Sequence, residues 1–139
     1  MAGIKVVLDD GAYMPVRAHK ADAGLDLRSP KDFIIEAGKA AIIDTGVHVE
    51  IPYGYVGMLK SKSGLNVRCG IVGEGTIDSG YTGSIVVKLY NLEDGSVAFR
   101  KGDKIIQLVV MPVCLDDVVL AEALDETERG DGGFGSTGR

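Results

Sequence analysis

The hydrophobic positions of this chain fall into short runs that turn-forming residues separate. In one run Val47, Val49 and Ile51 alternate with His48 and Glu50, which is the period of a strand with one face in a core. Comparable runs rich in β-branched residues occur at 4–8, 33–35, 40–43, 55–59, 84–90 and 105–113. This spacing predicts an all-β sandwich or barrel.

Helix-forming patterns are scarce. Residues 63–68 could form one short helical turn, but no longer segment keeps apolar residues at a 3.6-residue period. Glycine-containing turns at 93–95 and 101–103 predict a hairpin at each place. The length of 139 residues suits one domain.

The last fourteen residues differ from the rest of the chain. Residues 126–139 are rich in glycine, and Phe134 is their one large apolar side chain, so they can add little to a core. A disordered tail is the ordinary interpretation of such a segment. Its mixture of a cation, an aromatic ring and hydroxyl groups suits a nucleotide better than a linker. We therefore expect a single barrel domain at 1–125 and a flexible arm at 126–139.

The overall charge narrows the partners. The formal net charge of -5 gives no support for binding to nucleic acid or to an anionic membrane, so any anionic ligand needs locally placed cations. The sequence shows neither a signal-peptide pattern nor an apolar run near the roughly 20 residues that span a bilayer. These features predict a soluble, cytoplasmic protein.

Several short motifs could carry chemistry, but each has an ordinary structural interpretation. The lysine, serine and glycine at 62–64 could bind phosphate or could end a solvated strand. The glycine-flanked segment 75–83 holds an acidic and an aromatic residue and, taken alone, indicates a hairpin. Asp26 lies between two leucines, where it could be the outward position of an alternating strand.

The order of these motifs is more specific than any one of them. The sequence resembles the five ordered motifs of the trimeric dUTPases, here at 21–27, 62–65, 75–83, 101–108 and 129–138. The resemblance implies a distorted jelly-roll barrel and a homotrimer with shared active sites. It also implies magnesium-assisted hydrolysis of dUTP to dUMP and pyrophosphate, which removes dUTP from the nucleotide pool and supplies dUMP for dTMP synthesis.

The resemblance assigns roles to single residues. Asp78 corresponds to the catalytic carboxylate that holds and deprotonates the water attacking the α-phosphate. Tyr81 corresponds to the aromatic residue whose ring excludes a 2′-hydroxyl. Asp26 corresponds to the aspartate that binds Mg2+ through water, the ion itself being held by phosphates and solvent. The remaining implied substrate contacts are Lys62, Ser63, Gly64, Gly75, Thr76, Ile77, Gln107, Arg129, Phe134, Gly135, Ser136 and Thr137.

Three positions depart from the family pattern. Lys62 and Lys104 stand where arginine is usual, and Thr82 follows Tyr81 where arginine is frequent. Lysine keeps the charge but loses the bidentate fork of a guanidinium group. These departures predict an altered affinity and intact chemistry.

Two other functions remain open. A dCTP deaminase shares the barrel and several motifs; the complete C-terminal motif argues against it, while Glu74 could still serve as its glutamate base. The other alternative is a non-catalytic sensor of uracil nucleotides. The presence of both Asp26 and Asp78 argues against a loss of catalysis.

Overall fold

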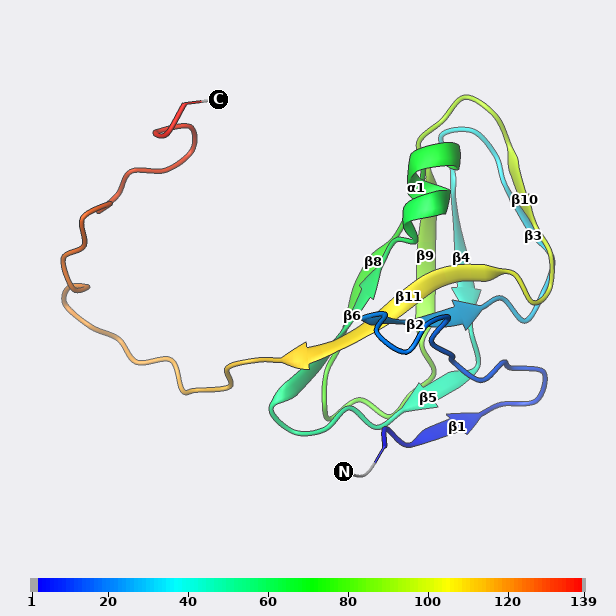
Figure 1. Ribbon diagram of the computed structural model, residues 1–139, viewed down its shortest axis with the longest axis horizontal. Helices are drawn as coiled ribbons and strands as arrows, with labels where there is room; N and C mark the ends of the chain where they lie inside the picture. The colour runs from blue at the N-terminus through cyan, green and yellow to red at the C-terminus, as the bar shows by residue number, and fades with distance from the viewer. Residues whose placement is uncertain (1–2, 139) are drawn as a thin grey trace.

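The computed structural model describes residues 3–138 as an all-β fold with one short helix and a long C-terminal extension (Figure 1). The helix is α1 (Ser63–Cys69). The strands are β1 (Val6–Leu8), β2 (Gly24–Arg28), β3 (Phe33–Ile35), β4 (Ala40–Asp44), β5 (Val47–Val49), β6 (Tyr55–Lys60), β7 (Ile71–Val72), β8 (Glu74–Ile77), β9 (Val86–Asn91), β10 (Val97–Phe99) and β11 (Lys104–Pro112).

The strands pair into antiparallel sheets that share a single core. The larger sheets have the orders β2-β11-β6-β8 and β4-β9-β7, and the pairs β1-β5 and β10-β3 complete the barrel. Each sheet turns apolar side chains inward, and most of these are β-branched, as suits a pleated surface. The core consists of Leu27, Ile35, Ile43, Val47, Val49, Ile51, Leu59, Ile71, Ile77, Ile85, Val87, Leu89, Phe99, Ile105, Ile106 and Leu108.

Two strand pairs form one continuous antiparallel ribbon that bends at a corner. The chain runs from β2 into β3 and from β10 into β11, so the pair β2-β11 continues as the pair β3-β10. Hydrogen bonds of the Ser29 backbone stabilise the bend between the two pairs. The Ser29 N–H donates to the Asp103 carbonyl at 2.9 Å, and the Gly102 N–H donates to the Ser29 carbonyl at 2.8 Å. Beyond the corner, Phe33 stacks on Phe99 with ring centroids 4.6 Å apart. Segments far apart in sequence thus wrap the core together, as in a jelly roll.

Some predictions of local structure are confirmed and others are wrong. The all-β class and the short helix are confirmed. The alternation over 47–51 is also confirmed, because both valines and Ile51 are buried while Glu50 is exposed. The hairpins predicted at 93–95 and 101–103 are wrong. The chain bends at 93–95 and turns at 101–102, but β10 pairs with β3, and β11 pairs with β2 and β6, so neither place joins strands that are neighbours.

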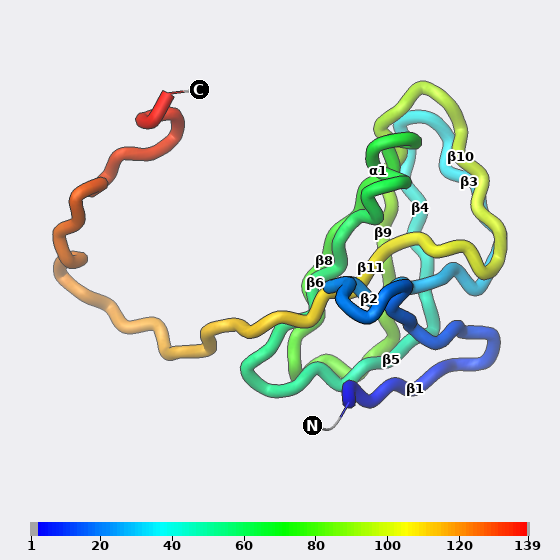
Figure 2. The backbone as a smooth tube through the Cα atoms, viewed as in Figure 1, coloured from blue at the N-terminus to red at the C-terminus, as the bar shows by residue number. Residues whose placement is uncertain are grey.

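The chain leaves the barrel after β11. Residues 113–138 run away from it as an extended, irregular segment that Figure 2 traces in orange and red. The predicted boundary between residues 125 and 126 stays a prediction. Within residues 3–138, no helix has the length and apolar character that crossing a membrane requires.

Candidate active site

Two lysines hold a buried carboxylate of the barrel. Asp26, on β2, is only 6% exposed. Lys62, just before α1, forms an ion pair with one of its oxygens, Oδ1. Lys104, at the start of β11, places its Nζ 3.1 Å from the other oxygen, Oδ2. The strand position was expected, but an outward, solvated aspartate was not found.

A β-bulge brings Lys104 to this side of the sheet. Lys104 pairs with Arg28, and the register then shifts so that Ile106 pairs with Leu27 and Gln107 with Asp26. Residues three apart on a regular strand point to opposite faces. The extra residue of the bulge reverses that relation, so Lys104 and Gln107 share the face of Asp26. Both Ile105 and Ile106 are buried as a result.

The two lysines keep Asp26 ionised. Burial acts to raise the pKa of Asp26, but the hydrogen bonds from Lys62 and Lys104, together with their charges, outweigh burial and lower that pKa below its ordinary value of 3.8. The carboxylate is therefore negative across the physiological range. Its two partners leave a local excess of one positive charge.

Gln107 and a neighbouring glycine complete this cluster. The Gln107 side-chain amide donates to the Ser61 carbonyl at 3.0 Å. A Cβ atom on Gly24 would lie 2.0 Å from the Gln107 Oε1, so only glycine leaves room for this side chain. Ser63 and Gly64 lie exposed in the first turn of α1. We call Asp26, Lys62, Lys104 and Gln107 the Asp26 cluster.

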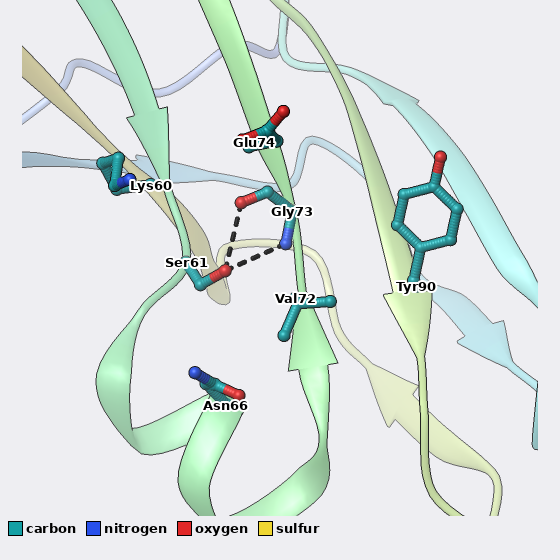
Figure 3. Close-up of a pocket in the computed structure, with 7 residues that line it drawn as sticks. All are labelled: Lys60, Ser61, Asn66, Val72, Gly73, Glu74 and Tyr90. Carbon is teal, nitrogen blue, oxygen red and sulfur yellow. Dashed lines mark hydrogen bonds between the residues drawn. The ribbon is translucent and has the colours of Figure 1, made fainter. Parts of the chain in front are cut away.

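A hollow of about 500 Å³ lies between the end of β6, α1, β7 and β9. Figure 3 shows that Ser61 joins two sides of it, because its hydroxyl donates to the Gly73 carbonyl and accepts from the Gly73 N–H, both at 3.0 Å. Lys60, Glu74 and Tyr90 also line the hollow. These bonds tie the segment before Lys62 to the start of β8.

The predicted base-binding residues Gly75, Thr76 and Ile77 form an edge strand. Instead of the predicted hairpin, β8 pairs with β6 and ends the four-stranded sheet. Within residues 3–138, the other edge of β8 pairs with no strand, so its outward N–H and C=O groups are available to a ligand.

The turn after β8 carries the predicted catalytic residue, Asp78, and the predicted substrate-binding residue Tyr81. Asp78 is exposed, and its carbonyl accepts from the Tyr81 N–H at 3.0 Å. The Tyr81 hydroxyl donates to the Ser84 carbonyl at 2.7 Å. A Cβ atom on Gly83 would lie 2.4 Å from that hydroxyl oxygen, so the glycine allows the ring to fold back over the turn. The Tyr81 ring is thereby fixed over the turn that begins at Asp78.

The predicted arm residues form local turns away from both groups. Arg129, Phe134, Gly135, Ser136 and Thr137 all lie on the extension, and Phe134 is fully exposed. Their hydrogen bonds run within the arm; for example, the Ser136 N–H donates to the Gly133 carbonyl at 3.2 Å.

The register of the sheet separates the Asp26 cluster from Asp78. Asp26 pairs with Gln107, Gln107 with Lys60, and Lys60 with Glu74, so these residues form a row across four strands. Asp78 lies four residues beyond Glu74, about 13 Å along the strand at ~3.3 Å per residue. The three strand spacings add about 14 Å sideways. Followed along the sheet, the path between the two groups of one chain is therefore roughly 19 Å.

The sequence prediction missed two participants. Lys104 was named only as a replacement for arginine, because a bulge leaves no mark on hydrophobic periodicity. His48 was predicted to be an outward strand residue, yet it hydrogen-bonds to the Thr82 carbonyl next to Tyr81. Among residues 3–138, no group of three or more His, Cys, Asp or Glu side chains could hold a metal ion directly.

Comparison with protein families gives a match over most of the chain. The family model described as dUTPase matches residues 10–138. The chain is 45% identical over 136 residues to a deoxyuridine 5'-triphosphate nucleotidohydrolase of Corynebacterium efficiens, covering 95% of this chain and 75% of that protein. It is 45% identical over 142 residues to the protein of that name from Mycobacterium avium, covering 96% and 92%.

Solved structures agree with these relatives. The dUTPase of Staphylococcus bacteriophage 80alpha, solved with dUPNHPP, has a TM-score of 0.94 and 33% identity, with complete coverage of both chains. A mutant dUTPase from phage phi11 of S. aureus, described for its coordination of a structural Mg(II) ion, has a TM-score of 0.82 and 31% identity. That comparison covers 88% of this chain and 98% of the phage protein.

Proposed function

The chain belongs to the dUTPase family, and from that premise we propose that it hydrolyses dUTP to dUMP and pyrophosphate. The observation that carries the proposal is the match over residues 10–138 to a family whose relatives bear this activity in their names. The phage relative solved with dUPNHPP supports the same substrate class. The sections of the chain that resemble family motifs each present side chains or backbone groups suited to part of this substrate.

The reaction begins with a water molecule beside Asp78. The exposed carboxylate accepts a hydrogen bond from this water, orients it toward the α-phosphorus and takes its proton as the new P–O bond forms. The bond from the α-phosphorus to the bridging oxygen breaks, and pyrophosphate departs. Because Asp78 follows a strand anchored to the core by Ile77, its backbone is held in place before substrate binds.

Substrate selection uses the free edge of β8 and the ring of Tyr81. Backbone groups of residues 75–77 match the N3–H donor and O4 acceptor of uracil, whereas cytosine presents the opposite polarity and leaves polar groups unpaired. The Tyr81 ring, fixed by its bond to Ser84, lies against the deoxyribose and excludes a 2′-hydroxyl.

The Asp26 cluster receives the phosphate chain and its magnesium ion. A buried, ionised carboxylate is the hard oxygen donor that Mg2+ prefers, and a single such group suits an ion that arrives with its phosphates and keeps its water. When bound, Mg2+ neutralises charge on the phosphate oxygens. Asp26 would hold the ion, and Lys62, Ser63, Gly64 and Gln107 would bind the phosphates.

The separation within one chain supports a homotrimer with shared sites. The path from the Asp26 cluster to Asp78 runs along roughly 19 Å of sheet, and this separation supports a site whose two groups come from different copies. The extension also exposes apolar side chains that a neighbour would cover, with Val118 101%, Leu120 98% and Leu124 91% exposed.

The arm closes the site in this proposal. Arg129, Ser136 and Thr137 clamp the γ-phosphate, and Phe134 stacks on uracil with Gly135 beside it. The arm has few contacts of its own, so substrate contacts must offset the entropy lost when it becomes ordered.

The test is pyrophosphate release from dUTP, dTTP, dCTP and UTP, with and without Mg2+, while ammonia release from dCTP is followed in parallel. We expect magnesium-dependent release from dUTP alone. Ammonia from dCTP would instead support the deaminase and give Glu74 a role. No release from any of the four, with dUTP still bound, would support the nucleotide sensor.

A further inference from the structure

His48 connects the N-terminal segment to the turn that carries Asp78 and Tyr81. It lies on β5 with its side chain 28% exposed. Its Nδ1 is 2.8 Å from the Thr82 carbonyl oxygen, and its Nε2 is 3.0 Å from Asp9 Oδ1 in the loop after β1. Thr82 directly follows Tyr81, so this bond holds the turn at the residue beside the aromatic ring.

Both partners of the ring can only accept hydrogen bonds. A carbonyl oxygen and an ionised carboxylate have no proton to donate, whereas a neutral imidazole has one N–H and one lone pair. Making both bonds therefore requires the imidazolium form, with a proton on each nitrogen. If His48 loses a proton, one lone pair faces an acceptor oxygen and one of the two bonds is lost.

The other side of the turn is held independently of pH near neutrality. The Ser84 hydroxyl bonds to Asp44, and the Thr45 hydroxyl donates to the Ile85 carbonyl at 2.6 Å. The Ile85 N–H donates to the Val47 carbonyl at 2.8 Å. Residues 84 and 85 are thus fixed to β4 and β5, and the bond from His48 extends this attachment to Thr82, nearer Tyr81 and Asp78.

We propose that His48 is a positioning residue for the reaction: its doubly donating imidazolium ring fixes the Asp78–Tyr81 turn against β5. This inference rests on the proposed function, because the turn matters only if Asp78 and Tyr81 act on dUTP. The ring does not touch substrate in this proposal. It acts through the Thr82 backbone, and a loosened turn misplaces the carboxylate and therefore lowers kcat.

The charged groups around the ring favour its protonated form. The bond to the Thr82 carbonyl, the hydrogen bond and charge of Asp9 and the charge of Asp44 raise the pKa of His48 above its ordinary value of 6.5, although desolvation opposes them. Lys5 and Glu50 line the same hollow, but they pair with each other at 3.0 Å and largely cancel. A raised pKa means that the ring joins Asp9 to Thr82 through both bonds at low pH, and that this connection is broken at one of the two bonds as pH rises through the folded-state value.

The experiment compares pH profiles of kcat for dUTP hydrolysis in the wild type, His48→Gln, Asp9→Asn and the control Asp10→Asn. Asp10 is the adjacent aspartate, and its substitution makes the same change of charge. Glutamine keeps one N–H donor group but does not titrate. We expect wild-type kcat to exceed that of His48→Gln by about tenfold below the His48 pKa, the size of losing one charge-assisted hydrogen bond. The two should converge above that pKa.

Substitution of Asp9, the carboxylate that pairs with His48, gives a second test. In Asp9→Asn the alkaline fall of kcat should move to lower pH, because the ring loses its anionic partner, whereas Asp10→Asn should keep the wild-type profile. The chain has two histidines, so an NMR titration of the ring protons, assigned with His48→Gln, measures the His48 pKa directly. The Thr82 amide signal should shift with the same midpoint.

Failure of the His48 proposal and failure of the proposed function give different results. Parallel pH profiles of kcat in the wild type and His48→Gln would overturn the proposal, as would an NMR midpoint at or below the ordinary 6.5. A wild type that binds dUTP but does not hydrolyse it at any pH would refute the proposed function instead. The NMR midpoint and the Thr82 shift would then still decide whether the imidazolium ring holds the turn.

Discussion

Replacing Asp26 by asparagine removes the charge that both lysines of the Asp26 cluster compensate, with little change in shape. At the 3.1 Å separation of Lys104 Nζ and Asp26 Oδ2, a Coulomb energy with an effective dielectric constant near 20 is about 5 kcal/mol before any cost of dehydration. Dehydrating the carboxylate offsets several kcal/mol of this. The lysine side chains are 26% and 35% exposed, so they regain water once the charge is gone. We expect Asp26→Asn to lower the free energy of unfolding by about 2 kcal/mol.

The dependence of this loss on pH identifies its cause. A lowered pKa means that the stabilisation is fully present above the unfolded value, near 3.8, and disappears as pH falls through the folded value. The difference between the wild type and Asp26→Asn should therefore be constant at neutral pH. It should narrow only as the pH drops below 3.8 toward the folded-state value.

Urea unfolding followed by circular dichroism measures the difference, at one fixed chain concentration because assembly contributes to stability. Glu50→Gln is the matched control. It breaks a pair with Lys5 of similar length, 3.0 Å, whose side chains are 60% and 80% exposed, so its effect should stay below about 0.5 kcal/mol. Equal losses in the two variants, or a loss from Asp26→Asn that persists unchanged in acid, would refute the argument.

Two further substitutions and one truncation test the proposed roles. Asp78→Asn should cut kcat by about 100-fold or more, the contribution of a general base, while calorimetry still detects binding of a non-hydrolysable dUTP analogue. Removal of residues 129–139 should reduce turnover by about 100-fold in a steady-state assay and leave the thermal midpoint of the barrel unchanged. Gly24→Ala would place a Cβ atom 2.0 Å from Gln107 Oε1 and displace that flexible side chain, so kcat/KM should fall by about tenfold while the far-ultraviolet spectrum stays the same. Wild-type kinetics in any of the three would contradict the corresponding role.

Local pattern predicted the strands well and their pairing poorly. The run at 47–51 could be assigned because its alternation is a property of the chain itself, and burial follows directly from it. The chain does change direction at 93–95 and at 101–103, as predicted, but such a change does not determine which strands pair. In this fold β10 pairs with β3 and not with the strands next to it in sequence. The paired residues Val97 and Ile35 are 62 positions apart in the chain. Such non-local pairing depends on the whole core.

In the candidate site too, sequence predicted some residues, while the contribution of others depends on non-local structure. The order of motifs indicated Asp26, Lys62 and Gln107 together, and the structure brings these three to one face. The contribution of Lys104 depends on one extra residue in β11, which reverses the face of every side chain before it. His48 could be placed on the polar face of its strand, but its bond to Thr82 spans 34 residues and depends on a loop packing beside β5.

In the proposed function, the lysines at 62 and 104 would supply the local attraction that an acidic chain needs for a triphosphate. The net charge of -5 repels anions at a distance, so attraction has to come from a local excess of cations. One arginine could occupy both oxygens of Asp26 with its fork and leave the group neutral. Here each oxygen has its own ammonium group, so the cluster of two lysines and one carboxylate keeps one positive charge in a partly buried place. Lysine is a compact point charge on a flexible stem, and it can turn from a carboxylate to a phosphate without rebuilding a bidentate geometry. The departures from arginine are therefore consistent with retained phosphate binding.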